Sequence, residues 1–313
     1  MNREIAFILN QGKSIKRKNK ISLGMNDKIM GIIFYVIATI FAIFCLYPFL
    51  QVIISSFADE LTLTIEGFKL FPSKLSIDAY RTLFANSQIL KAYAVTIFIT
   101  VVGTILCVLV TAMAAYALSG KKLKYRNIIN LFFYVTMIFS GGLIPFYVLI
   151  TNYLKLADNL LVYILPAAFN VWNMFLLKNF FNEIPSEIIE SAQLDGASEL
   201  RIALQIIFPL SLPALATVSL FTALGFWNEW MSSMLYISNP DFYTLQYIIV
   251  RMVENVSTAR AIGEAHLPPG IITVPAETLR LATSVITIGP IILLYPWLQK
   301  YFVTGLRVGG VKG

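Results

Sequence analysis

Side chains that could carry catalysis or hold a metal ion are few and far apart in this 313-residue sequence. His266 is the single histidine, and it has no cysteine or carboxylate neighbour at the spacing of a metal site. Cys45 and Cys107 both fall in apolar stretches, where cysteine behaves as a small hydrophobic residue, so no disulfide framework is predicted. A Gly-x-x-x-x-Gly-Lys-Ser/Thr phosphate loop is missing, which excludes ATP binding of that type. We therefore predict no catalytic residue, no cofactor and no metal site.

An acidic stretch between Phe180 and Pro213 interrupts the apolar chain and is its most informative feature. Ser186 follows a proline and precedes acidic residues, so we expect it to cap a short helix whose first turn includes Glu190. Gly196 should end that helix, because glycine accepts left-handed backbone angles, and a second helix should begin at Ser198. The pattern predicts two short helices joined by a turn. A solvated acidic loop is the alternative.

The composition is that of an integral membrane protein. Hydrophobic residues make up 58% of the chain, charged residues only 13%, and the mean hydropathy is +0.74. A helix needs about 20 apolar residues to cross the bilayer. The fold predicted on this basis is an all-α, polytopic bundle of six transmembrane helices. The expected spans are Ile29–Ile54, Ala92–Leu118, Ile128–Ile150, Leu160–Leu177, Ile207–Ile237 and Leu281–Val303.

The distribution of lysine and arginine predicts the orientation, since cytoplasmic loops retain positive charge. Basic residues gather in an N-terminal arm, residues 1–28, and in the Gly120–Asn127 loop. Both segments should therefore lie inside the cell. We expect a single membrane domain at residues 29–303, whose loop at about residues 180–206 also lies inside, and a cytoplasmic tail at residues 304–313. Membrane topology also explains the net charge of +7 better than nucleic-acid binding does.

Residues of the acidic stretch resemble the EAA loop of bacterial ABC-importer permeases. Glu190, Ala192, Gly196 and Ala197, followed by Pro-Leu-x-x-Pro from Pro209, carry this resemblance. In that family the loop docks the membrane subunit onto its ATPase. The resemblance implies an ABC-importer type I permease fold and an ATPase-coupling loop. Its expected residues are Glu190, Ser191, Ala192, Asp195, Gly196, Ala197 and Pro209, with serine at 191 where the motif has alanine.

Four further segments are similar to the carbohydrate branch of the same family, which includes the maltose importer's second permease and Gram-positive permeases for complex oligosaccharides. These segments are Pro72–Tyr80, Phe139–Tyr147, Phe226–Trp230 and Leu298–Leu306. The resemblance implies a transport subunit of the bacterial plasma membrane, not an enzyme, that moves a sugar by alternating access. Its implied partners are a second homologous permease, two cytoplasmic ATPase subunits and an extracellular sugar-binding lipoprotein. A non-sugar solute carried by the same mechanism is the alternative.

Polar side chains inside predicted spans are candidates for the translocation path, because polar groups in hydrocarbon are costly unless they face a cavity or a partner. Aromatic rings beside amide groups suit sugars, whose faces stack while their hydroxyls bond. Tryptophan at the membrane interface and asparagine bonded to a neighbouring helix are the alternatives. The candidates are Asn170, Asn173, Trp227, Asn228 and Glu229.

Overall fold

The computed structural model describes residues 25–85, 87–120, 123–252, 254, 277–289 and 292. The predicted arm up to residue 24, His266, the Leu298–Leu306 segment and the tail at 304–313 lie outside the described residues. The chain divides into two units, residues 1–51 and 52–313, which are treated separately. In the first unit, residues 25–51 belong to helix α2, Met25–Ser56, whose apolar side chains are exposed almost throughout, as a membrane span requires.

The described part of the second unit contains only helices and loops, apart from one isolated antiparallel bridge between Ala58 and Leu75. Residues 245–252 and 277–289 are also helical. The first half of the unit contains α3 Glu60–Glu66, α4 Asp78–Ala85, α5 Ser87–Ser119, α6 Arg126–Ile138, α7 Leu143–Val148, η1 Leu149–Tyr153, α8 Leu161–Ile164 and α9 Val171–Asn182. The second half contains α10 Ser186–Leu194, α11 Glu199–Ile202, η2 Ala203–Ile207, α12 Phe208–Leu210, α13 Leu212–Trp227, α14 Met231–Tyr236 and η3 Pro240–Phe242.

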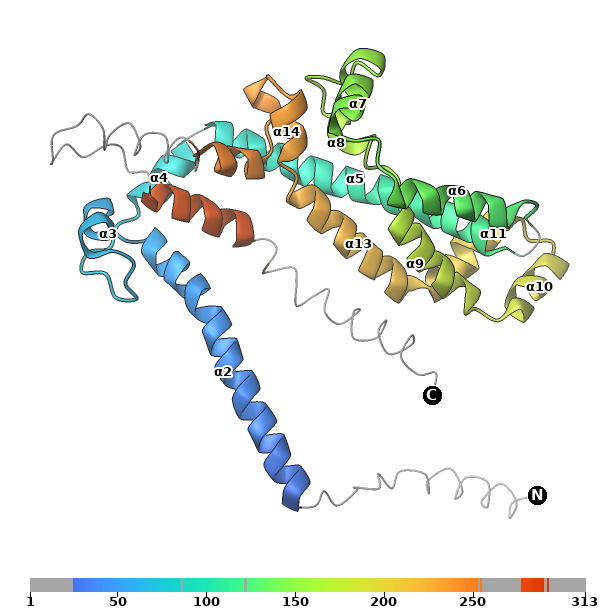
Figure 1. Ribbon diagram of the computed structural model, residues 1–313, viewed down its shortest axis with the longest axis horizontal. Coiled ribbons are helices and arrows are strands. Elements are labelled where there is room, and N and C mark those ends of the chain that lie inside the picture. The colour runs from blue at the N-terminus through green and yellow to red at the C-terminus, as the bar shows by residue number, and fades with distance from the viewer. Residues whose placement is uncertain are drawn as a thin grey trace, which may run out of the picture. The chain divides into compact units, whose positions relative to one another are not determined.

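Helix α5 is the centre of this unit, and α9 and α13 run along it (Figure 1). Its buried face is marked by residues three or four apart, including Ala92, Thr96, Ile99, Cys107 and Thr111, which is the spacing of one face of a helix. Several of these side chains are small, which lets the neighbouring backbones approach closely. The packed face of α5 thereby holds α9 and α13, the two helices that flank the acidic loop.

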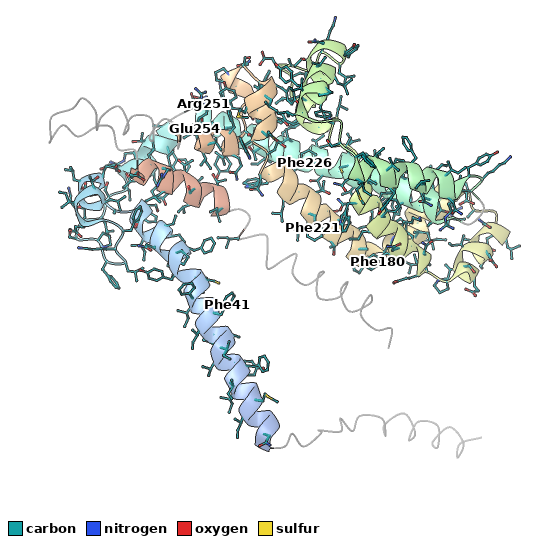
Figure 2. The ribbon with its side chains drawn as sticks, viewed as in Figure 1. Phe41, Phe180, Phe221, Phe226, Arg251 and Glu254 are labelled. Atoms are coloured by element: carbon teal, nitrogen blue, oxygen red, sulfur yellow. The ribbon has the colours of Figure 1, made fainter. Side chains whose placement is uncertain are left out.

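The crossing of α5 and α13 depends on Gly103. A Cβ atom added at Gly103 would lie 2.5 Å from the Phe226 ring, closer than any real contact. Phe226 is labelled in Figure 2. Phe226 is only 5% exposed, so its ring has little room to move. The absence of a side chain at Gly103 is therefore what allows α13 to lie against α5 at this level.

We expect Gly103→Ala to destabilise the protein by about 1–3 kcal/mol, the usual effect of overpacking a core. Thermal unfolding of the purified protein measures this loss. The double variant Gly103→Ala with Phe226→Leu should recover most of it, because a leucine side chain is shorter than the ring. Ala substitution at Gly31, where nothing lies within 4 Å, is the matched control. An unchanged melting temperature for Gly103→Ala would contradict the proposed close contact.

The predicted spans are only partly continuous. Within the described residues, two helices are long and apolar enough to cross a membrane, Ile29–Ser56 and Ser87–Ser119, and they match the first two predicted spans. Two bent pairs raise the number to four if each pair is one span: Arg126–Ile138 with Leu143–Tyr153, bent by 106°, and Glu199–Leu210 with Leu212–Trp227, bent by 86°. The count of six therefore stays a prediction.

Three of the expected spans are not single uninterrupted helices in the structure. The Ile128–Ile150 span breaks at a Gly141–Gly142 pair, where Gly142 has φ +88°. The Leu160–Leu177 span breaks between α8 and α9, in a segment that contains Pro166. The Ile207–Ile237 span bends at Ser211, between two prolines, and its helix ends at Trp227. In the sixth predicted span, Leu281–Val303, residues 281–289 are helical, and its predicted end lies outside the described residues.

Candidate functional site

The acidic stretch forms two helices joined by a tight turn, as predicted. Its first helix, α10, begins directly after Pro185. The expectation that Ser186 caps this helix was wrong, because Ser186 is its first residue and no side chain bonds to the free amides there. Glu187 lies in the first turn, whereas Glu190 lies one turn further along the helix and is exposed. The charge of Glu190 is thus presented from the middle of α10, not from its terminus.

The turn after α10 is a Schellman motif centred on Gly196. The Ala197 N–H donates to the Ala192 carbonyl at 3.0 Å, and the Gly196 N–H donates to the Gln193 carbonyl at 3.0 Å. This pair of bonds forms only when the residue after the helix has left-handed backbone angles, and Gly196 has φ +78°. Ala192 and Ala197 belong to the same apolar cluster, which supplies the hydrophobic contact typical of this motif. The prediction that Gly196 ends the first helix in a left-handed conformation is confirmed.

The second helix, α11, is short and runs directly into the segment that leads to α13. Ser198 caps α11 by accepting a hydrogen bond from the Arg201 N–H at 3.4 Å. The helix continues without interruption into the π-helical turn η2 and into α12. Pro209 lies in α12, just before the 86° bend to α13. The turn at Gly196 is therefore followed by continuous helical backbone up to Leu210, at the bend that leads into α13.

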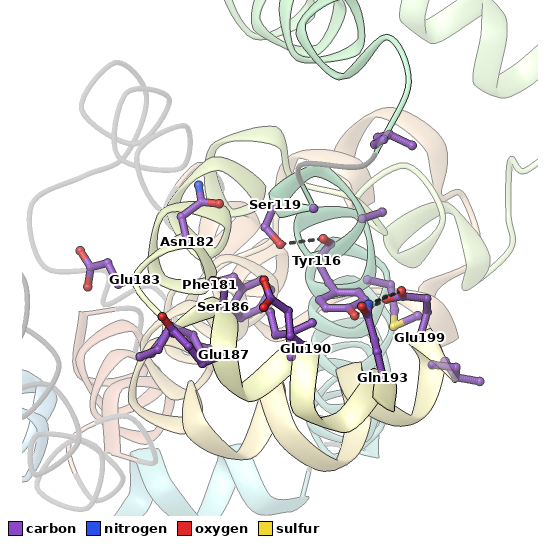
Figure 3. Close-up of a pocket in the computed structure, with 18 residues that line it drawn as sticks. Tyr116, Ser119, Phe181, Asn182, Glu183, Ser186, Glu187, Glu190, Gln193 and Glu199 are labelled. Carbon is purple, nitrogen blue, oxygen red and sulfur yellow. Dashed lines mark hydrogen bonds between the residues drawn. The ribbon is translucent and has the colours of Figure 1, made fainter. Parts of the chain in front are cut away.

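Glu199 ties this loop to the end of α5. Its carboxylate accepts a hydrogen bond from the Tyr116 hydroxyl at 2.6 Å and another from the Gln193 side-chain amide at 3.0 Å. Figure 3 shows these groups converging from α5, α10 and α11. The tie joins residues 83 positions apart, and the spacing of the sequence offered no signal for it. Behind it, Ala192 and Ile202 are buried in a cluster with Leu177 and Phe181.

A cleft of about 980 Å³ opens beside the loop (Figure 3). The ends of α5 and α9 form one wall, and α10 with α11 forms the other. Apolar side chains such as Ile189 and Leu200 line it together with the carboxylates of Glu187, Glu190 and Glu199. This combination of apolar lining and acidic rim suits a protein segment better than a small apolar molecule.

The predicted coupling residues differ in exposure. Glu190, Ser191, Asp195, Gly196 and Pro209 are exposed, Ala197 is half-buried, and Ala192 is buried. Leu194, which sequence reasoning did not single out, is 89% exposed in the last turn of α10. Leu194 is thus exposed next to Asp195 and Gly196, its neighbours in the chain.

Two of the candidate path residues bond within the chain. Asn170 caps α9, where its side-chain oxygen accepts from the Asn173 N–H at 2.9 Å. Asn173 is 6% exposed, and its side-chain amide donates to Thr222 on α13 at 3.3 Å. Asn173 thus joins α9 to α13 in the manner of an interhelical hydrogen bond.

The other three candidates surround the break between α13 and α14. Trp227 is buried, and its indole N–H donates to the Thr287 carbonyl at 3.2 Å. Asn228 is exposed and ends α13. Glu229 is half-buried, and its carboxylate accepts from the Ser232 N–H at 2.8 Å in the first turn of α14. Non-helical backbone at membrane depth is tolerated where it is covered by protein or lines a cavity.

A hydroxyl network that the sequence did not predict holds this break in place. The Thr244 hydroxyl donates to the Glu229 carbonyl at 2.6 Å and lies 3.0 Å from the Ser233 hydroxyl. The Tyr163 hydroxyl lies 2.6 Å from the Ser233 hydroxyl, and Thr96 of α5 accepts from the Leu245 N–H at 2.9 Å. These bonds fix the geometry of Glu229 against four separate segments.

Comparison with known proteins places this arrangement in one family. Residues 108–308 match the family described as binding-protein-dependent transport system inner membrane component. The polygalacturonan/rhamnogalacturonan transport system permease protein YtcP of Bacillus subtilis is 37% identical over 289 residues, covering 92% of this chain and 100% of that one. The arabinooligosaccharides transport system permease protein AraQ of Halalkalibacterium halodurans is 29% identical over 279 residues, covering 87% and 93%.

A solved structure agrees with this assignment. A chain from the crystal structure of a bacterial ABC transporter involved in the import of the acidic polysaccharide alginate matches with a TM-score of 0.77 and 30% sequence identity. The match covers 89% of this chain and 98% of that one. The family consists of membrane transport components and not of the enzymes that energise them. With its acidic two-helix loop, its broken helices and these matches, the chain belongs to the inner membrane components of binding-protein-dependent transport systems.

Proposed function

We propose that this chain is the permease subunit of an ABC importer that carries a sugar or oligosaccharide across the bacterial plasma membrane. It pairs with a second, homologous permease, with two cytoplasmic ATPase subunits and with an extracellular sugar-binding lipoprotein. Both of its termini and the loop at residues 180–206 lie in the cytoplasm. ATP hydrolysis on the partner subunits drives the alternation between inward-open and outward-open arrangements.

The observation that carries this proposal is the loop's mechanical connection to the membrane helices. Its outer surface, with Glu190, Leu194 and Asp195, is exposed and available to a partner. Its inner side is tied to α5 through Glu199 and runs through α12 into α13. A displacement of α10 by an ATPase subunit would therefore move the ends of α5 and α13 with it. This is the coupling that a transport cycle requires.

The break after α13 is the proposed contribution of this subunit to the translocation path. Asn228 is exposed there, and its side-chain oxygen accepts from the Gln246 amide at 3.2 Å, so two amide groups lie side by side. Trp230 is 38% exposed beside them. Amide groups next to an aromatic ring can bond the hydroxyls of a sugar and stack on its face. Asn170, Asn173 and Trp227 support this region from within the chain.

A carbohydrate substrate is supported by the relatives, whose names specify polygalacturonan, rhamnogalacturonan, arabinooligosaccharides and alginate. The direct test uses the complete complex with its binding protein in proteoliposomes. ATPase activity should rise when the binding protein is loaded with an oligosaccharide, and the trial set should include uronate-containing and neutral oligosaccharides. Stimulation by amino acids or peptides, with none by any oligosaccharide, would overturn the carbohydrate assignment.

The proposed topology predicts which residues an impermeant thiol reagent can reach. In a parent with Cys45 and Cys107 replaced by alanine, a cysteine at Ser198 should be protected in intact cells and should react after permeabilisation. A cysteine at Lys155, in the loop between η1 and α8, should react in intact cells and is the matched control. Labelling of the Ser198 cysteine from outside intact cells would show that the proposed orientation is wrong.

A further inference from the structure

Two cations from different helices lie close together at the start of α6. Arg126 is the first residue of α6, and Lys178 belongs to the last turns of α9. The Lys178 ammonium donates to the side-chain oxygen of Asn130 on α6 at 2.8 Å. It also lies 5.4 Å from the centre of the Phe175 ring, so its position is fixed from two sides. Because the acceptor, Asn130, carries an uncharged amide, this bond does not neutralise the charge of Lys178.

The charge of this pair is not balanced by the hydrogen bonds of the described chain. The Nε atom of Arg126 is buried and has no hydrogen-bond partner among the described residues. Burial lowers the pKa of Lys178, and the nearby Arg126 guanidinium lowers it further. Two cations held together and partly out of water are costly unless an anion compensates them. A buried guanidinium N–H without an acceptor indicates that such an anion is missing from the isolated chain.

The start of α6 itself favours an anion. Tyr125, the residue before the helix, has φ +64°, and no side chain caps the free N–H groups of the first turn. Those groups and the helix dipole place partial positive charge beside Arg126. Lys124 adds a further cation one residue earlier in the chain, with its ammonium 5.1 Å from the centre of the Tyr125 ring.

The face of α6 opposite this cluster is apolar and uncovered by the described chain. No residue of α6 is buried. One face of the helix carries large apolar side chains at the spacing of successive turns, with exposed fractions between 43% and 65%. They are Ile128, Leu131, Phe132, Val135 and Ile138. An outer face of this kind suits contact with hydrocarbon, so the first turn of α6 is placed where a lipid headgroup would lie.

We propose that Arg126 and Lys178 bind the phosphate of an anionic phospholipid of the cytoplasmic leaflet, at the junction of α6 and α9. Basic pockets between membrane helices at that leaflet are suited to acidic headgroups. The side of the membrane follows from the proposed orientation, but binding itself can be measured whatever the substrate or the direction of transport. The site lies between α6 and α9, and α9 leads into the coupling loop.

Native mass spectrometry of the purified permease–ATPase complex, with added phosphatidylglycerol or phosphatidylcholine, tests this site. The parent should retain phosphatidylglycerol in preference, and the double variant Arg126→Gln with Lys178→Gln should weaken that preference by about 30-fold, which corresponds to about 1 kcal/mol for each charge. Lys69→Gln with Lys155→Gln, two lysines outside the cluster, is the matched control and should bind like the parent. The charge-preserving pair Arg126→Lys with Lys178→Arg should retain the lipid.

Three results would overturn the proposal. Equal phosphatidylglycerol binding by the parent and the double glutamine variant would show that the cations do not hold the headgroup. Loss of the second permease from the double variant, with lipid binding unchanged in the complexes that remain, would show that the cations pair with that subunit. Binding of inorganic phosphate alone at this site, as strong as binding of the lipid, would show that the site takes free anions. A failed uptake assay for sugars would leave this lipid measurement intact.

Discussion

Replacing Gly196 by valine is expected to abolish substrate uptake while leaving the protein in the membrane. Gly196 has φ +78°, and an L-residue in the left-handed region costs about 1–2 kcal/mol, with a β-branched side chain at the unfavourable end. The Schellman turn should open, so the hydrogen bonds that Gly196 and Ala197 donate to α10 would be lost. The exposed face of α10 would then no longer be held at a fixed angle to α11. Uptake of labelled oligosaccharide at matched protein levels measures the effect.

Asparagine at the same position separates backbone conformation from side-chain bulk. Nothing lies within 4 Å of a Cβ atom at Gly196, so neither variant collides with a neighbour. Asparagine adopts left-handed angles more readily than other residues with a side chain, and Gly196→Asn should therefore retain a substantial part of the uptake. If the valine variant takes up substrate as fast as the parent, this turn has no role in coupling. Equal loss in both variants would point to a contact at the glycine surface itself.

Glu229→Leu is expected to reduce transport at least tenfold, whereas Glu229→Gln should stay close to the parent. The Glu229 carboxylate accepts a hydrogen bond from the Ser232 N–H at the start of α14. Leucine would leave that amide without its acceptor, at a cost of about 1–3 kcal/mol, and glutamine would keep an oxygen in the same place. Since Asn228 is the neighbouring residue, a shift of this break would also displace the amide proposed to face the substrate.

The measurement pairs uptake with recovery of the permease heterodimer. Loss of transport with normal assembly in the leucine variant assigns Glu229 to the translocation path, and loss of assembly assigns it to the contact between permeases. Thr222→Val, which removes the acceptor of Asn173 on the opposite side of α13, is a control for general loosening of that helix. If both Glu229 variants transport and assemble like the parent, Glu229 has no part in either function.

The membrane character of the chain and the loop at Gly196 were predictable from the sequence because both depend on local properties. Apolar runs such as those of α2 and α5 predict spans through their length alone. A glycine after an acidic helix predicts a left-handed turn, since few other residues accept that conformation. Ser198 was likewise predictable as the start of the second helix, although the matching prediction for Ser186 was wrong because α10 begins one residue earlier.

Only the tertiary structure decided which polar groups meet. The bond between Tyr116 and Glu199 joins segments 83 residues apart, and the bond between Asn173 and Thr222 joins segments 49 apart. Hydropathy cannot reveal such pairs, because it records how apolar a segment is and not which face another helix covers. The break after α13 has the same origin, because the hydroxyl network behind Glu229 holds it through side chains of α5 and α8 that are distant in the sequence. Glycines and prolines in the other broken spans show that a bend is allowed there, but the sequence does not show how far the chain turns.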